Sequence, residues 1–133
     1  MTLTPEETTI LVVEDEEKIG SLIELLLKRT GYTLLRAANG GDALALSKEY
    51  QGTIHLLLTD IMMPDMHGPE LAERLSEVRP EMRILFMSAF SGSNKVRQEI
   101  LESGRGFLAK PFKPSDLVKK VQEVLQGPPE RAR

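Results

Sequence analysis

The chain alternates five times between a short apolar segment and a segment with the periodicity of an amphipathic helix. The apolar segments cover residues 9–13, 33–37, 54–59, 83–87 and 106–109, and each predicts a β-strand. Helical spacing follows them at residues 19–30, 42–50, 69–79, about 94–103 and 116–125. Neighbouring parallel strands need a crossover connection, and such crossovers wind right-handed. The alternation therefore predicts an α/β fold with a five-stranded parallel sheet. Because the strands are apolar along almost their whole length, we expect the five helices to cover both faces of that sheet.

Composition agrees with one globular domain and excludes several classes of function. The 133 residues are 41% hydrophobic and include no Cys, so neither disulfides nor a structural zinc site is expected. A formal net charge of −3 provides no basic surface of the kind that nucleic acid selects. The apolar runs are far shorter than the ~20 residues that span a bilayer, and residues 1–7 do not form a signal peptide. We therefore expect a cytoplasmic protein with no direct nucleic-acid contact and no membrane insertion.

Polar residues follow the predicted strands at the edge where such sheets bind ligands. Glu14 and Asp15 follow the first strand, Asp60 the third, Ser88 the fourth and Lys110 the fifth. The carboxyl ends of parallel strands lie together at one edge of the sheet, and ligands bind there at the topological switch point. The sequence thus predicts that these five side chains meet in one site.

The chemistry of the five residues favours a divalent cation and a phosphate. Carboxylates within about 5 Å of one another would repel by roughly 3 kcal/mol per pair at an effective dielectric constant of about 20. Mg²⁺ relieves such repulsion, since it binds one or two carboxylates, carbonyls and waters and leaves positions for phosphate oxygens. The Lys110 ammonium and the Ser88 hydroxyl can hold an oxyanion. Asp60 is then the best nucleophile on this edge.

Four segments at the ends of four strands resemble the receiver domain of two-component response regulators. They are VVEDE at residues 12–16, LLTDIMMPDMHG at 57–68, ILFMSA at 84–89 and FLAKPF at 107–112. The resemblance extends over residues 9–125. It implies a flavodoxin-like fold with the strand order 2-1-3-4-5.

The resemblance also implies a phosphoacceptor and a metal site. Asp60 would take a phosphoryl group from the phosphohistidine of a histidine kinase or of a histidine phosphotransfer domain. Mg²⁺ would be coordinated by Asp15, Asp60 and the backbone carbonyl of Met62, with Glu14 acting through a bound water. The domain would catalyse its own phosphorylation by positioning and charge neutralisation, without being an enzyme of many turnovers.

A switch is implied by the same resemblance. Lys110 and Ser88 would hold the phosphoryl oxygens, and the Lys110–Pro111 peptide bond would be cis. On phosphorylation Ser88 would move toward the phosphoryl group and Phe107, which stands where relatives often carry Tyr, would turn inward. Repacking of the fourth helix, fifth strand and fifth helix would then change the binding of an unidentified downstream protein. A plain core position for Phe107 stays open.

Residues near the acceptor predict how long the phosphorylated state lasts. Met62 lies two positions after Asp60, and Phe90 lies two positions after Ser88. Neither side chain can orient a water for attack on the acyl phosphate, so slow autodephosphorylation is expected.

The two histidines have simpler interpretations: His67 is solvated, and His55 caps the edge of the sheet or accepts a local hydrogen bond.

Alternatives differ in the residues that they require. A phosphatase or dehalogenase with an Asp nucleophile would need a second Asp where Met62 stands, and a flavin or nucleotide site would need a glycine-rich loop after the first strand. A degenerate receiver that serves only as an interaction scaffold is the main alternative.

We expect a leader or linker at residues 1–8, the receiver at 9–126 and a polar tail or linker at 127–133. The chain is then a stand-alone regulator or the receiver of a longer protein, and residues 7–16 resemble the receivers of hybrid histidine kinases, which favours the second.

Overall fold

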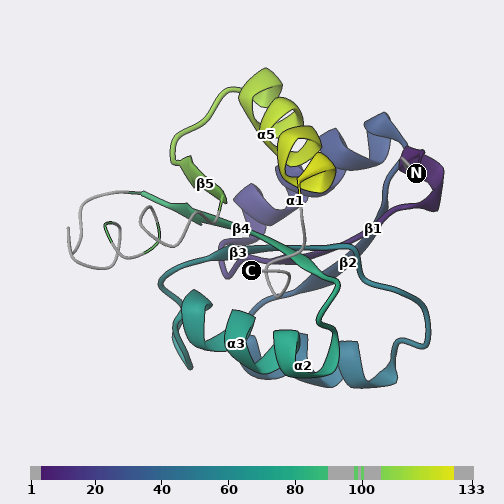
Figure 1. The fold of residues 1–133 in the computed structure, drawn as a ribbon. Helices are drawn as coiled ribbons and strands as arrows, with labels where there is room; N and C mark the ends of the chain where they lie inside the picture. Colours follow the sequence, from purple (N-terminus) through teal and green to yellow (C-terminus); the bar gives the residue numbers. More distant parts are fainter. Residues whose placement is uncertain (1–3, 90–97, 99, 101–105, 128–133) are drawn as a thin grey trace.

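Five parallel strands form the centre of the molecule. The computed structural model describes residues 4–89, 98, 100 and 106–127 (Figure 1). The strands are β1 (Thr9–Val13), β2 (Thr33–Ala37), β3 (Leu56–Asp60), β4 (Arg83–Ser88) and β5 (Gly106–Ala109). They pair in parallel in the order β2-β1-β3-β4-β5. The predicted fold class and strand order are confirmed.

Four helices in the described part of the chain cover the two faces of the sheet. They are α1 (Glu17–Thr30), α2 (Gly40–Glu49), α3 (Gly68–Val78) and α5 (Pro114–Gln126). Figure 1 shows α1 and α5 on one side of the sheet and α2 and α3 on the other. Most of the predicted fourth helix lies outside the described residues, but Gln98 and Ile100 are helical and Ile100 is buried in the core.

Successive residues of each strand point to opposite layers, which gives the molecule two apolar clusters. Strand residues of the layer that faces α2 and α3 include Leu11, Val13, Leu57, Ile84 and Phe86. Those of the layer that faces α1 and α5 include Ile10, Val12, Leu56, Leu58, Leu85 and Met87. β1 and β3 are buried at every position, since each has neighbouring strands on both edges and helices on both faces. The central strands are thus the firmest supports for a site at their carboxyl ends.

Helix ends account for most of the differences from the sequence-based boundaries. Gly31 closes α1 in the left-handed conformation. α2 begins at Gly40, two residues earlier than expected, with Asn39 as the N-cap. α5 begins at Pro114, two residues before the predicted helical spacing starts, because a proline ring suits a first helical position.

The first described residues pack onto the sheet. Pro5–Glu7 forms a 3₁₀ helix, and the Thr33 N–H donates to the carbonyl of Thr8 at 3.0 Å. Thr8 is 3% exposed. Residues 5–8 of the expected leader therefore continue the packed fold. None of the helices in the described ranges is both long and apolar enough to cross a membrane.

Candidate functional site

Three carboxylates meet at the carboxyl ends of β1 and β3. Glu14 follows β1 and is 2% exposed, while Asp60 ends β3 and is 7% exposed. Asp15 is exposed beside them. One carboxylate oxygen of each lies within 4.8 Å of the others. The strand order is what brings residues 14 and 60 together, because β1 and β3 are direct neighbours in the sheet.

Lys110 provides a positive charge in the same site. Its Nζ lies 2.9 Å and 3.0 Å from the two carboxylate oxygens of Asp60 and 2.5 Å from Oε1 of Glu14. The backbone N–H of Lys110 also donates to the backbone carbonyl of Ser88 at 2.8 Å, which extends the pairing of β4 with β5. The Lys110–Pro111 peptide bond is cis, as the family resemblance implied.

Burial and charge shift the proton equilibria of these groups. Burial raises the pKa of Asp60 to about 7, with the neighbouring Glu14 carboxylate acting in the same direction against Lys110. Burial opposes ionisation of Glu14 too, but hydrogen bonds with Asp60 and Lys110 lower the pKa of Glu14 below its usual value. The two carboxylates in turn raise the pKa of Lys110 despite its burial. The site concentrates negative charge around one fixed ammonium.

The donor set of this site fits a hard divalent cation. Three carboxylates supply oxygen ligands, which Mg²⁺ prefers, and exposed Asp15 leaves one side open for the waters that Mg²⁺ keeps. Glu14 is held in place, because its Oε2 accepts from the Glu16 N–H at 3.1 Å while Oε1 faces Lys110. The residues present therefore form an acidic cluster that could bind a metal ion.

The other residues singled out in the sequence have different settings. Ser88 ends β4 and is half-buried, and Phe107 of β5 pairs in register with Phe86 and packs against the layer that faces α2 and α3. The Met62 side chain is 62% exposed. Phe90 lies outside the described residues. His55 accepts a hydrogen bond from the Thr9 N–H at Nδ1, in agreement with its predicted local role.

The loop between β3 and α3 contains two residues whose role the sequence analysis missed. Asp65 accepts hydrogen bonds from the N–H groups of Gly40 and Gly41. A side chain on Gly68 would collide with the backbone carbonyl of Asp60, so glycine allows α3 to start directly against the acceptor strand. The sequence offered no local signal for Asp65, because the N–H groups that it accepts from begin a helix more than twenty residues away.

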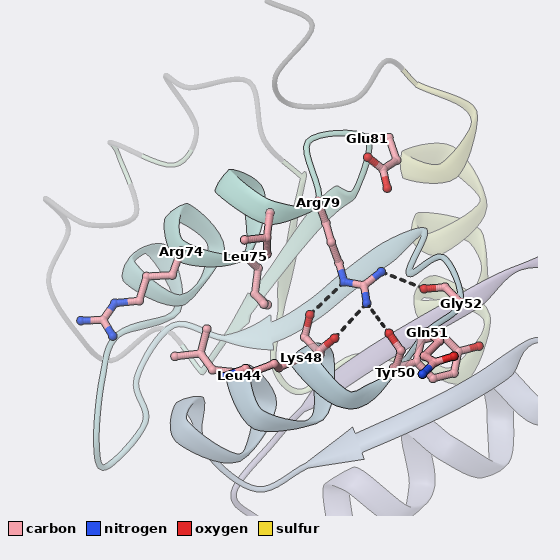
Figure 2. Close-up of a pocket in the computed structure, with 11 residues that line it drawn as sticks. Leu44, Lys48, Tyr50, Gln51, Gly52, Arg74, Leu75, Arg79 and Glu81 are labelled. Atoms are coloured by element: carbon pink, nitrogen blue, oxygen red, sulfur yellow. Dashed lines mark hydrogen bonds between the residues drawn. The ribbon is translucent and has the colours of Figure 1, made fainter.

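A cavity of about 620 Å³ lies elsewhere, between the ends of α2 and α3 (Figure 2). None of the predicted site residues lines it. Arg79 projects into it and donates to Ser47 Oγ and to the carbonyls of Ser47, Tyr50 and Gly52. These contacts satisfy carbonyls at and beyond the C-terminal end of α2, so the arginine connects two helices rather than offering a charge to a ligand.

Together, the strand order 2-1-3-4-5 and the acidic, lysine-containing site at the carboxyl edge define a flavodoxin-like α/β domain with an acidic cluster that could bind a metal ion. The sequence model described as "Response regulator receiver domain" matches residues 10–122. The chain belongs to this family, and is thus a receiver domain of two-component signal transduction, a class of signalling domain that is phosphorylated on an aspartate.

Known relatives agree with the family. The chain is 33% identical over 118 residues to "Sensor kinase CckA" of Brucella abortus (strain 2308), covering 89% of this chain and 12% of that protein. It is 38% identical over 117 residues to "Uncharacterized transcriptional regulatory protein YrkP" of Bacillus subtilis (strain 168), covering 88% of this chain and 49% of that protein. The chain therefore spans half or less of these two relatives.

A solved structure matches the fold over nearly its whole length. The CheY-like response regulator receiver domain protein from Methanospirillum hungatei JF-1 superposes with a TM-score of 0.78 at 32% sequence identity. The match covers 89% of this chain and 93% of that chain. The fold is thus similar to that of a crystallised CheY-like receiver domain protein.

Proposed function

We propose that Asp60 accepts a phosphoryl group from the phosphohistidine of a histidine kinase or histidine phosphotransfer domain. The observation that carries this proposal is the contact of both Asp60 carboxylate oxygens with Lys110 beside two further carboxylates. A carboxylate oxygen of Asp60 forms the new bond to phosphorus as the phosphorus–nitrogen bond breaks, and the imidazole nitrogen keeps the electron pair. Lys110 stands where it can balance charge on the transferred oxygens.

The reaction is proposed to depend on Mg²⁺. Asp15, Asp60 and the backbone carbonyl of Met62 would hold the ion, and Glu14 would reach it through a water. When bound, the ion supplies positive charge to the carboxylates and to the phosphoryl oxygens. Glu14 meanwhile keeps Lys110 in the site through their direct ion pair.

Labelling with a small phosphodonor tests the acceptor. Phosphoramidate and MgCl₂ should add one phosphoryl group to the wild-type chain, as measured by intact mass, and none to Asp60→Asn. Asp42→Asn, which removes an exposed carboxylate in the first turn of α2, is the matched control and should be labelled like wild type. Equal labelling of Asp60→Asn, or full labelling in excess chelator, would contradict the proposal. An unlabelled wild type would favour the scaffold alternative.

The output is proposed to run through Ser88 and Phe107 to a partner-binding surface that includes β5 and α5. The backbone link between Ser88 and Lys110 supports this route, because β4, which ends at Ser88, is the neighbour of β5, which Lys110 follows. Phosphorylation should shift the NMR signals of backbone amides in β5 and α5. The shifts should be smaller in Ser88→Ala, although Asp60 is still labelled. Equal shifts in both proteins would exclude a role for the Ser88 hydroxyl.

We further propose that the phosphorylated state decays slowly, since neither Met62 nor Phe90 can orient a water. Met62→Asn and Phe90→Glu would each supply one hydrogen-bonding group, and about 1 to 1.5 kcal/mol of orientation corresponds to roughly a tenfold faster decay. The exposed Met62 side chain leaves room for the change. First-order loss of phosphate from the purified chain measures the rate. Rapid decay in wild type, or decay unchanged by both substitutions, would contradict the proposal.

The proposed receiver unit comprises residues 9–126, acting in the cytoplasm where a histidine kinase presents its phosphohistidine. The relative named a sensor kinase supports a kinase as the phosphoryl source, and it also supports a receiver within a longer protein. The test is expression of residues 9–126 alone, which should retain the folded state and the phosphoramidate labelling of the chain. Loss of labelling in this fragment would show that the flanking residues belong to the functional unit.

A further inference from the structure

The segment that joins the acceptor strand to α3 is tied to a different helix by one carboxylate. Asp65 Oδ1 accepts from the Gly40 N–H at 3.0 Å, and Asp65 Oδ2 accepts from the Gly41 N–H at 2.8 Å. Gly40 and Gly41 are the first two residues of α2, where backbone N–H groups have no partner within the helix. Asp65 thus provides an acceptor for both of these N–H groups, although it lies more than twenty residues away in sequence.

Two glycines allow the loop between β3 and α3 to pack closely against its neighbours. A side chain on Gly40 would collide with the Met66 side chain, so glycine there lets the residue after Asp65 pack against α2. At the end of the loop the Gly68 N–H donates to the Ile61 carbonyl at 2.7 Å. Met62 lies between these fixed points, in the turn that leaves Asp60.

We propose that Asp65 is a positioning residue that fixes the loop between β3 and α3, so that the backbone carbonyl of Met62 is held toward the acidic cluster before a cation binds. This inference rests on the proposed function, because it concerns the same metal site. Asp65 acts through the backbone and touches neither Asp60 nor the phosphoryl group. The bidentate contact favours the ionised carboxylate, which agrees with a pKa of Asp65 lowered by the Gly41 and Gly40 N–H groups.

Two substitutions of Asp65 remove its hydrogen bonds to α2 to different extents. Asp65→Asn keeps one acceptor oxygen and turns an amide group toward the second N–H, whereas Asp65→Ala removes both acceptors. Groups that orient metal ligands typically change metal affinity by about 10- to 100-fold when they are removed. We expect the Mg²⁺ Kd of the full chain, measured by NMR titration with MgCl₂, to rise about tenfold in Asp65→Ala and less in Asp65→Asn.

Asp42→Asn is the matched control. It also removes one negative charge, in the turn of α2 that Asp65 contacts, but the Asp42 hydrogen bonds are with Asn39 rather than with the loop. Its Mg²⁺ Kd should stay within about twofold of wild type. Because the Asp65 effect acts through hydrogen bonds, the ratio between Asp65→Ala and wild type should persist in 0.5 M NaCl, whereas a long-range charge effect would be screened.

The phosphorylation kinetics separate positioning from general damage to the fold. With phosphoramidate as donor, Asp65→Ala should need about tenfold more Mg²⁺ for half-maximal labelling, yet its rate at saturating Mg²⁺ should approach that of wild type. A lower melting temperature with an unchanged Mg²⁺ Kd would overturn the inference and leave only a structural role for Asp65. A Kd shift equal to that of Asp42→Asn would overturn it as well.

The same experiments distinguish this inference from the proposed function. If wild type binds Mg²⁺ with the predicted Asp65 dependence but is not labelled, the positioning role stands and the phosphoacceptor proposal fails. If wild type is labelled on Asp60 and the Asp65 variants match it in Mg²⁺ dependence, the phosphoacceptor proposal stands and the positioning role fails. A wild type that binds no Mg²⁺ would overturn both the positioning role and the metal part of the proposed function.

Discussion

Ser76 places a hydroxyl group inside an otherwise apolar layer under α3. The residue is 2% exposed, and within the described part of the chain its Oγ has no hydrogen-bond partner. A buried polar group without a partner costs about 1 to 3 kcal/mol, and alanine is also the better helix former. Ser76→Ala should therefore keep or increase the free energy of unfolding, by up to about 1 kcal/mol in urea denaturation.

Ser47 provides the control for this prediction. It is equally buried, but its Oγ accepts from Arg79 Nε at 2.8 Å. Ser47→Ala should lower the free energy of unfolding, since the guanidinium would lose an acceptor. If Ser76→Ala were the more destabilising of the two, an unrecognised partner of its hydroxyl would be required.

His55 makes the stability of the chain depend on pH. Burial and the nearby charge of Arg83 lower the pKa of His55 below 6.5 in the folded state. Protonation would also remove the lone pair that accepts the Thr9 N–H. The contribution of the neutral ring is thus complete above pH 6.5 and is lost as the pH falls toward the folded-state pKa, because the unfolded chain binds the proton first.

His55→Asn isolates this effect, since the amide oxygen can accept the same N–H without titrating. The stability difference between wild type and His55→Asn should shift in favour of the variant as the pH falls from about 7 to 5. Urea denaturation at each pH measures it, and titrations common to both proteins cancel. A constant difference between wild type and His55→Asn across this range would contradict the prediction.

At the scale of elements, Arg79 joins the C-terminal end of α2 to α3. Its guanidinium makes four hydrogen bonds to Ser47, Tyr50 and Gly52 (Figure 2). Arg79→Ala should lower the free energy of unfolding by about 2 to 3 kcal/mol, since several carbonyls lose a charged donor. Arg79→Lys should recover less than half of that, because an ammonium cannot reproduce the planar fork.

Arg74 is the matched control on the rim of the same cavity. It forms an exposed ion pair with Glu70 one helical turn away, at 2.8 Å. Arg74→Ala should change the free energy of unfolding by about 0.3 to 0.5 kcal/mol, as exposed pairs of this spacing do. Similar losses in the two alanine variants would argue against the role of Arg79 at the helix end.

Periodicity predicted the strands and helices well, because burial repeats every second residue in a strand and every three to four in a helix. The ends of helices were harder to predict, since distant residues complete them. α2 starts at Gly40 because Asp65 accepts from its first N–H groups, and residue 65 is not visible in the local pattern of residues 39–42. Glu14, Asp60 and Lys110 were predictable as neighbours, because each directly follows or ends a strand of a parallel sheet.

At the scale of the whole molecule, the acidic cluster links metal binding to stability. An ion that binds only the folded chain stabilises it by about 1.4 kcal/mol at ten times its Kd. Millimolar Mg²⁺ should therefore raise the melting temperature of wild type by several degrees in calorimetry. Asp15→Asn should lose most of this increase, while without metal it should be no less stable than wild type because one repulsion is removed.

An acid outside the cluster gives the reference for this measurement. Asp116→Asn lies in the first turn of α5 and should respond to Mg²⁺ like wild type. Equal increases in wild type and Asp15→Asn would place the ion elsewhere on the chain.

The two signs of charge in the site come from strands at different positions in the sheet. Glu14 and Asp60 sit at the ends of β1 and β3, which have strands on both edges, whereas Lys110 follows β5, a four-residue strand at the edge of the sheet. Amides of β5 should therefore exchange with deuterium faster than those of β1 and β3, and equal protection would contradict this. Brief local opening would then withdraw the ammonium while the carboxylates stay fixed, so the lifetime of a bound anion would be limited by the fraying of an edge strand.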